Sequence, residues 1–151
     1  MTPPTAAAER LLAIDYGSRR LGLAVSEGTT AIPLGALERK DDRAAVRALI
    51  RLAEREAITG FILGEPRRLD GTRGEAAQKV SRFAERLRQE SGLTVELVDE
   101  TLTSVEAARR LRAGGYDPAR HPERIDAVSA QILLEEALAR RARARGGRGS
   151  P

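Results

Sequence analysis

Residues 11–25 read LLAIDYGSRRLGLAV, which is two apolar runs on either side of the polar stretch DYGSRR. Each run is long enough for a buried strand, and Gly17 and Ser18 between them favour a turn. Because the link is short, the two strands are predicted to pair as an antiparallel hairpin. A third strand is predicted over 31–37, where Pro33 suits either the start of the strand or an edge of the sheet.

The rest of the chain alternates helices with strands. Apolar residues recur at helical spacing in four stretches, which predicts helices over 41–57, 75–90, 103–113 and 122–142. Short apolar runs predict strands over 61–63 and 94–98. The last helix is predicted to bury Ile125, Val128 and Ile132, with Leu133 as a further candidate for the buried face. Since strands that alternate with helices need crossover connections and pair in parallel, the sequence predicts an α/β fold whose mixed sheet carries helices on both faces.

The composition is that of one globular domain. The chain has 151 residues, of which 41% are hydrophobic and 32% charged, and this length can bury a single core. It has no cysteine and one histidine, His121, which argues against a disulfide scaffold, a thiolate metal site, a cysteine nucleophile and a histidine-based triad. No apolar run approaches the roughly 18 residues of a membrane span and no signal peptide is evident, so a cytoplasmic protein is expected.

The two ends of the chain differ from its body. Residues 1–9 are rich in proline and alanine and are expected to be loose. Residues 140–151 hold five arginines and no acid, whereas residues 1–139 hold 21 basic and 22 acidic side chains. We therefore expect one folded domain over 10–139 and a basic tail over 140–151. Such a tail favours polyanions, or is simply a solvated end of the chain.

Acidic residues lie where apolar runs end. They are Asp15 after the first strand, Asp99 and Glu100 after the fifth, and Asp126 in the first turn of the last helix. Sites in open α/β sheets gather at strand ends, and clustered carboxylates are stabilised by a cation, so these acids could hold Mg²⁺ or Mn²⁺. A pair of such ions can hydrolyse a phosphodiester. On spacing alone, the same acids could instead complete a turn, a strand exit and a helix N-terminus.

Arginines gather in two predicted loops. The turn of the first hairpin carries Arg19 and Arg20, and the segment before the second helix carries Arg67, Arg68 and Arg73. This second loop is long for a connection between a strand and a helix. Guanidinium groups in both loops could grip the backbone of a nucleic acid. The alternatives are an ordinary hairpin turn and a solvated loop.

Four stretches of the chain form a recognisable series. They read AIDYGSRRLGLAVSE (13–27), GEPRRLDGT (64–72), VDETLTS (98–104) and IDAVSAQILLEEAL (125–138). In this order and spacing they resemble the motifs of the YqgF/RuvX family of Holliday junction resolvases and pre-16S rRNA nucleases. The resemblance extends over nearly all of the predicted domain, and the four motifs together carry it rather than any one of them.

The resemblance implies an RNase H-like fold, a five-stranded mixed sheet with strands 1–3 antiparallel and with flanking helices. It also implies a nuclease site with two Mg²⁺ or Mn²⁺ ions, in which Asp15, Glu100 and Asp126 are the catalytic acids. Asp99 belongs to the same motif as Glu100 and is a further candidate ligand, and Arg20 matches the basic position of the first loop. The implied substrates are branched DNA or precursor rRNA, and a homodimer is expected if the substrate is a symmetrical junction.

The chain departs from the family's motifs at two positions. Thr101 stands where the family has arginine, which removes a bidentate phosphate donor. Glu65 stands where the family has leucine, and it is expected to place a negative charge in a loop near the substrate. These departures keep a second hypothesis open, a non-catalytic protein of the same fold that binds nucleic acid or a ribosome precursor.

Overall fold

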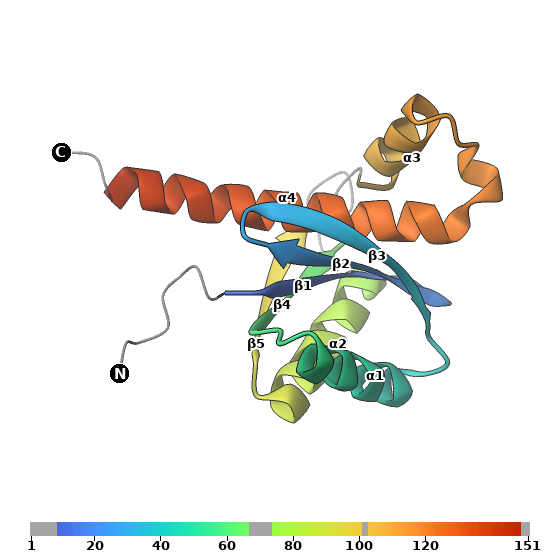
Figure 1. The fold of residues 1–151 in the computed structure, drawn as a ribbon. Coiled ribbons are helices and arrows are strands. Elements are labelled where there is room, and N and C mark those ends of the chain that lie inside the picture. Colours follow the sequence, from blue (N-terminus) through green and yellow to red (C-terminus); the bar gives the residue numbers. More distant parts are fainter. Residues whose placement is uncertain (1–8, 67–73, 101–102, 149–151) are drawn as a thin grey trace.

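A five-stranded sheet with helices on both faces forms the protein (Figure 1). The structure, a computed structural model, describes residues 9–66, 74–100 and 103–148. In chain order the strands are β1 (Leu11–Tyr16), β2 (Arg20–Glu27), β3 (Thr30–Glu38), β4 (Gly60–Glu65) and β5 (Thr94–Asp99). Side by side they run β3-β2-β1-β4-β5, so β1 occupies the centre of the sheet.

The first three strands form an antiparallel meander and the other two pair in parallel. β2 is antiparallel to both β1 and β3, while β4 is parallel to both β1 and β5. The predicted hairpin and mixed sheet are therefore confirmed. β3 is an edge strand, which is where a proline such as Pro33 is tolerated. Its ladder to β2 shifts register between Leu23 and Ala24, beside Gly35, whose φ of 102° favours glycine.

Four helices flank the sheet. They are α1 (Asp42–Arg55), α2 (Glu75–Ser91), α3 (Thr103–Ala113) and α4 (Pro122–Arg148), with a short 3₁₀ helix over Pro118–Arg120 before α4. α1 and α2 cover one face of the sheet, α4 crosses the other, and α3 packs against α4 (Figure 1). The side chain of Asp41 caps α1 by accepting from the N–H of Ala44 at 2.7 Å, and α2 ends at Gly92 in the left-handed region.

Alternation along the strands sends side chains into two separate cores. In β1, Leu12 and Ile14 lie in the core beneath α1 and α2. Leu11 and Ala13 lie in the core beneath α4. The next residue on the α4 face of β1 is Asp15, so the strand that fills both cores also delivers an acid to the edge of one of them.

α4 buries a different stripe from the predicted one. Its residues in the core against the sheet are Ala130, Leu133, Leu134 and Ala137. Of the predicted residues, Leu133 is buried, whereas Ile125, Val128 and Ile132 are only partly buried. For these three the prediction was wrong because it followed the bulkiest side chains, whereas alanines allow the helix to approach the sheet closely. Asp126 belongs to this alanine stripe, since it precedes Ala130 by one helical turn.

α4 also continues past the predicted end at Ala142, to Arg148, so most of the arginine-rich segment is helical. Arg141 donates to Glu9 at 2.7 Å and to Glu96 at 3.1 Å. These bonds fasten α4 to the segment before β1 and to β5. In the part of the chain that the structure describes, no helix combines the length and the apolar character needed to cross a membrane.

Candidate functional site

Asp15 lies at the carboxyl end of β1, near the middle of the sheet. Because side chains alternate along a strand, Asp15 follows Leu11 and Ala13 onto the face that α4 covers. The parallel strands β1, β4 and β5 all end at this edge, which is where sites form in open α/β sheets. Asp15 is partly buried there.

Arg39 holds the turn that follows Asp15. Its guanidinium donates to the carbonyls of Gly17 and Ser18, each at 2.9 Å, and pairs with Asp42 at 3.0 Å. Within the turn, the N–H of Gly17 donates to the carbonyl of Arg20 at 3.0 Å. The end of β1 and the start of β2 are thus fixed relative to each other, and with them Asp15 and Arg20.

Glu100 comes from the end of β5 and meets Asp15. Its N–H donates to the carbonyl of Glu65 at 3.2 Å, which extends the β4–β5 pairing by one residue. Its carboxylate lies over Gly64 and is hydrogen-bonded to Asp15. A Cβ at position 64 would overlap this carboxylate and lie 2.8 Å from Cδ1 of Leu133, so only glycine leaves room for Glu100 here.

The Asp15–Glu100 pair holds a proton. Burial first, then the charge of Asp15 and the hydrogen bond to it, raise the pKa of Glu100 to about 9. Burial also raises the pKa of Asp15; the hydrogen bond from Glu100 opposes this shift and the charge of Asp126 adds to it. Near neutral pH, Glu100 is therefore protonated and donates its O–H to Asp15. This shared proton is what allows two carboxyl groups to lie in contact.

Asp126 approaches the same edge from α4. It is the fifth residue of the helix, just past the first turn in which it was predicted, and its backbone rests on Gly22, the residue that pairs with Asp15 between β1 and β2. A Cβ at position 22 would overlap the carbonyl of Asp126. The Asp126 carboxylate accepts a hydrogen bond from Nε of Arg20 at 2.7 Å. The charge of Asp126 therefore acts on Asp15, but the carboxylate of Asp126 is already paired with Arg20.

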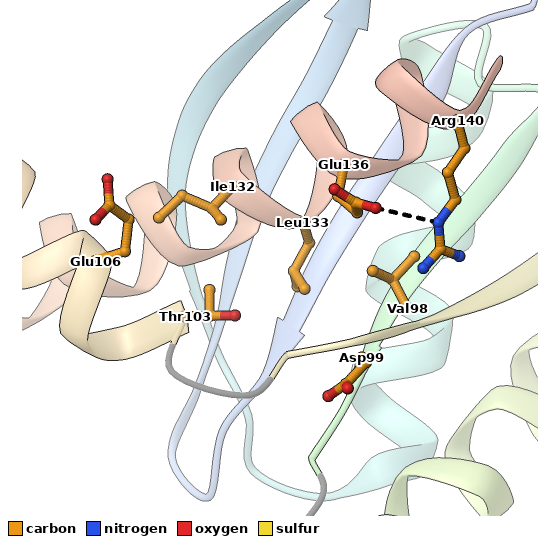
Figure 2. Close-up of a pocket in the computed structure, with 8 residues that line it drawn as sticks. All are labelled: Val98, Asp99, Thr103, Glu106, Ile132, Leu133, Glu136 and Arg140. Carbon is orange, nitrogen blue, oxygen red and sulfur yellow. Dashed lines mark hydrogen bonds and ion pairs between the residues drawn. The ribbon is translucent and has the colours of Figure 1, made fainter. Parts of the chain in front are cut away.

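Asp99 lies apart from the acid pair. It is exposed and points away from α4, whereas Val98 beside it points toward α4 (Figure 2). Its charge contributes to the raised pKa of Glu100 only as the smallest of several causes. Of the two neighbouring motif acids, Glu100 is the one that contacts Asp15.

Glu65 does not lie in a loop, and that expectation was wrong. It is the last residue of β4, pairs with Asp99 of β5, and is 7% exposed. Because β4 continues two residues beyond its apolar run, alternation carries Glu65 onto the same face as Leu63, beneath α1 and α2. Its carboxylate is therefore on the side of the sheet opposite Asp15.

The arginines predicted to bind nucleic acid have different surroundings. Arg19 is exposed at the β1–β2 turn, whereas Arg20 binds Asp126. The remaining predicted positions, Arg67, Arg68, Arg73 and the departure at Thr101, lie outside the described residues.

A cleft of about 450 Å³ lies beside the acid pair, between β5, α3 and α4 (Figure 2). Its charged lining is Asp99, Glu106, Glu136 and Arg140, and Arg140 donates to Glu136 at 3.2 Å. Three acids against one arginine disfavour the approach of a nucleic-acid backbone on this side.

A second cleft, of about 310 Å³, lies on the other side of the sheet edge, between the β1–β2 turn and α2. Tyr16, Arg39 and Lys79 line it, together with Glu75. The guanidinium of Arg39 lies 5.0 Å from the centre of the Tyr16 ring. This lining is more favourable to a phosphate backbone than that of the first cleft. Lys79 was not singled out from the sequence because it is one of many cations on the solvent side of an amphipathic helix.

Gly22 and Gly64 shape the site by leaving room for acids from other elements, and this role was not predicted for either. Each lies within a strand at the point where an acid from another element crosses it, Asp126 over Gly22 and Glu100 over Gly64. Glycine within an apolar strand pattern indicates a close approach by another group, so the signal was present in the sequence.

The acid pair suits a divalent cation in its chemistry, since carboxylate oxygens are the ligands that Mg²⁺ and Mn²⁺ prefer and a cation can replace the shared proton. The wider set is incomplete. Across residues 9–66, 74–100 and 103–148, no three histidine, cysteine, aspartate or glutamate side chains are gathered closely enough to hold a metal ion. Asp126 is the acid nearest to completing the set, and Arg20 binds it.

The proton on Glu100 predicts how stability depends on pH. The pKa of Glu100, about 9 in the fold, lies above its ordinary value of 4.5, so the folded state binds a proton that the unfolded chain releases. This stabilisation is fully present below pH 4.5 and is lost as the pH rises through 9. We expect the free energy of unfolding, measured by urea without divalent ions, to fall by about 2 kcal/mol between pH 5 and pH 7.

The matched control is Glu100→Gln, which keeps the hydrogen bond to Asp15 and cannot ionise. This variant is expected to be more stable than the wild type at pH 7 and to show a shallower dependence on pH. Equal slopes for the two proteins would contradict the assignment of the proton to Glu100.

Comparison with known proteins identifies close relatives. A family model described as RuvX, Holliday junction resolvase, matches residues 9–140. A protein of Koribacter versatilis named "Putative pre-16S rRNA nuclease" is 40% identical over 143 residues, which are 93% of this chain and 94% of the relative. A protein of the same name from Chloroflexus aurantiacus is 37% identical over 130 residues, 85% of each chain.

Several solved structures with a similar fold are junction resolvases. Thermus thermophilus RuvC, in complex with a Holliday junction substrate, has a TM-score of 0.59 at 19% identity, covering 89% of this chain and 96% of RuvC. The fowlpox virus resolvase, in complex with junction DNA, has a TM-score of 0.53 at 12% identity, covering 86% of this chain and 97% of the resolvase. These likenesses confirm the predicted RNase H-like fold. The family match over residues 9–140, with a relative 40% identical over 93% of this chain, shows that the chain belongs to the RuvX family of Holliday junction resolvases.

Proposed function

We propose that the protein is a divalent-metal-dependent endonuclease that cuts phosphodiester bonds in structured nucleic acid, either a four-way DNA junction or precursor rRNA. The observation that carries the proposal is the contact between Asp15 and Glu100, two acids far apart in the sequence, at the carboxyl ends of β1 and β5. A buried pair of carboxyl groups that shares a proton is costly to build for structure alone. It suits a site that exchanges the proton for a cation.

Asp15 and Glu100 would hold the cation directly, and Asp126 would complete the set. Divalent ions at such a site activate a water and stabilise the leaving oxygen in phosphodiester hydrolysis. The chain supplies the placement of the ligands: the β1–β2 turn fixes Asp15, and Gly64 gives Glu100 its room. α4 packs on Gly22 and so brings Asp126 to the same edge.

The charges around the pair suggest a path for the substrate. The cleft between β5, α3 and α4 is lined mostly by acids, whereas the cleft at the β1–β2 turn carries Arg39 and Lys79. We assign the nucleic-acid backbone to the second side, where Arg19 is exposed, and the proposed binding set also includes Arg67, Arg68 and Arg73. If the substrate is a symmetrical junction, cutting it in two places calls for a homodimer with two such sites.

A cleavage panel tests the proposal. Purified protein is offered a four-way junction, a linear duplex, a single strand and a precursor rRNA fragment, each with Mg²⁺, with Mn²⁺ and with EDTA. We expect cleavage of a junction or of precursor rRNA with either ion and none with EDTA, since in the proposed reaction the divalent ions activate the water and stabilise the leaving oxygen. Undiminished cleavage in EDTA would contradict the metal requirement.

A second candidate is a non-catalytic nucleic-acid binder of the same fold. The ion pair between Arg20 and Asp126 favours it, because it leaves only two acids available in the described part of the site. This candidate predicts binding in the panel that is unaffected by divalent ions, with no product from any substrate. Turnover that depends on Mg²⁺ or Mn²⁺ would exclude it.

A further inference from the structure

We propose that Arg20 is an internal counter-ion that holds Asp126 while the site lacks a metal ion, and that a divalent cation must displace it to gain Asp126 as a ligand. The inference rests on the proposed function and adds that Arg20 competes with the metal ion for the carboxylate of Asp126. Arg20 was predicted from the sequence to contact nucleic acid; its position in the structure gives it a different partner.

The geometry supports a specific bond rather than a general attraction. Nε of Arg20, at the start of β2, donates to Oδ2 of Asp126 at 2.7 Å, and this bond joins β2 to α4. Glu123 on the same helix also acts on Arg20 electrostatically. Asp126 is less exposed than Arg20, with 23% of its side chain accessible against 36%. Arg20 can therefore turn into solvent without disturbing a core.

The backbone of Asp126 has no such freedom. It packs directly on Gly22, so α4 cannot approach the sheet further or tilt inward. Recruitment of Asp126 to a cation then comes from rotation of its side chain, and rotation moves Oδ2 away from Nε of Arg20. Breaking the bond between Arg20 and Asp126 therefore decides whether a cation has two acidic ligands, Asp15 and Glu100, or three.

The charges at this edge of the sheet explain why Arg20 is paired with Asp126. Without a metal, three carboxyl groups at one edge repel one another, and burial strengthens the repulsion. Arg20 neutralises the charge of Asp126, which reduces this repulsion. A divalent cation bound to the acids would make that neutralisation unnecessary. A guanidinium left beside the cation would repel it, so the two compete for the same carboxylate.

The test is a titration with Mn²⁺ alone, followed by calorimetry, on the full chain. We expect Arg20→Gln to bind Mn²⁺ about tenfold more tightly than the wild type, because the competitor is gone. The matched control is Arg124→Gln, which removes the same charge from an exposed residue of α4 two positions before Asp126. Arg124 lies over the ring of Tyr116, 4.3 Å from its centre, and has no contact with the acids. Its loss is expected to leave the affinity within about twofold of the wild type.

A double-mutant cycle distinguishes the effect of losing the Arg20–Asp126 bond from the general effect of losing a positive charge. In an Asp126→Asn background the competition no longer exists, so adding Arg20→Gln is expected to change the affinity for Mn²⁺ no more than Arg124→Gln does. Arg20→Lys keeps the charge and guards against a variant that fails to fold; it is expected to bind Mn²⁺ close to the wild type. Thermal unfolding of each variant checks that the fold is retained.

The outcomes distinguish this inference from the proposed function. Equal Mn²⁺ affinities for Arg20→Gln and Arg124→Gln overturn the role of Arg20 and leave the nuclease proposal standing. Absence of Mn²⁺ binding in both the wild type and Arg20→Gln overturns both. Tighter binding by Arg20→Gln that persists in the Asp126→Asn background shows a long-range effect of charge and overturns the counter-ion role.

Discussion

Asp15→Asn is expected to lower the rate of cleavage by on the order of 10³-fold while leaving the affinity for nucleic acid nearly unchanged. The substitution keeps the shape of the side chain and its ability to accept the hydrogen bond from Glu100. It removes the charge that would hold a cation at the centre of the sheet edge. Since the phosphate-binding cations lie elsewhere, binding and catalysis should separate. Single-turnover cleavage and fluorescence anisotropy, on the same labelled substrate, measure the two quantities.

The matched control for this variant is Asp117→Asn. Asp117 is exposed and its side chain accepts from the N–H of Ala119 at 3.1 Å, which an asparagine can also do. The control is expected to cleave at the wild-type rate. If Asp15→Asn also cut the substrate at the wild-type rate, the acid pair would have no part in the reaction and the proposed function would have to be abandoned.

Gly22→Ala is expected to destabilise the protein by about 3 kcal/mol, near the upper end of the usual cost of overpacking. The new Cβ would overlap the backbone carbonyl of Asp126 and lie 2.9 Å from its Cα. Backbone cannot rotate away as a side chain can, so α4 would have to lift from the sheet and lose part of its packing on Ala13 and Ala24. The midpoint of urea unfolding measures the loss.

Gly146→Ala is the matched control for this second variant. Gly146 lies in α4, and a Cβ built there would have no atom within 4 Å. Because alanine favours helix more than glycine does, the control is expected to be neutral or to gain up to about 1 kcal/mol. A Gly22→Ala protein as stable as the wild type would mean that α4 does not pack on β2 as described.

Gly64→Ala should destabilise the protein less than Gly22→Ala, since the new Cβ at position 64 meets the flexible side chains of Glu100 and Leu133 rather than backbone.

The course of the backbone could be predicted because it depends on local patterns. The two apolar runs around DYGSRR produce the β1–β2 hairpin, and Gly92 ends α2 as glycine at a helix end does. The buried face of α4 could not be predicted in the same way. It is selected by how closely the helix can approach Gly22, a residue far away in the chain, and this distance favours alanine over the larger Ile125 and Val128.

The convergence of acids at the candidate site could be predicted from the sequence, but the ion pairs that those acids form could not. That acids meet where parallel strands end follows from topology, and Asp15 and Glu100 do meet there. Which cation binds which acid depends on side-chain geometry between β2 and α4, so the bond from Arg20 to Asp126 had no signal in the spacing. The side on which Glu65 lies depends on how far β4 runs beside β5, which is a matter of pairing rather than of composition.

The three acids come from the first strand, the end of the fifth strand and the last helix of the described chain. In a nascent polypeptide that emerges from the ribosome, Asp15 therefore appears first, Glu100 much later, and Asp126 only with α4. Until α4 has docked on Gly22, the carboxylates cannot converge. Translation products that stop before α4 consequently carry no assembled centre, so synthesis of α4 must precede formation of the site.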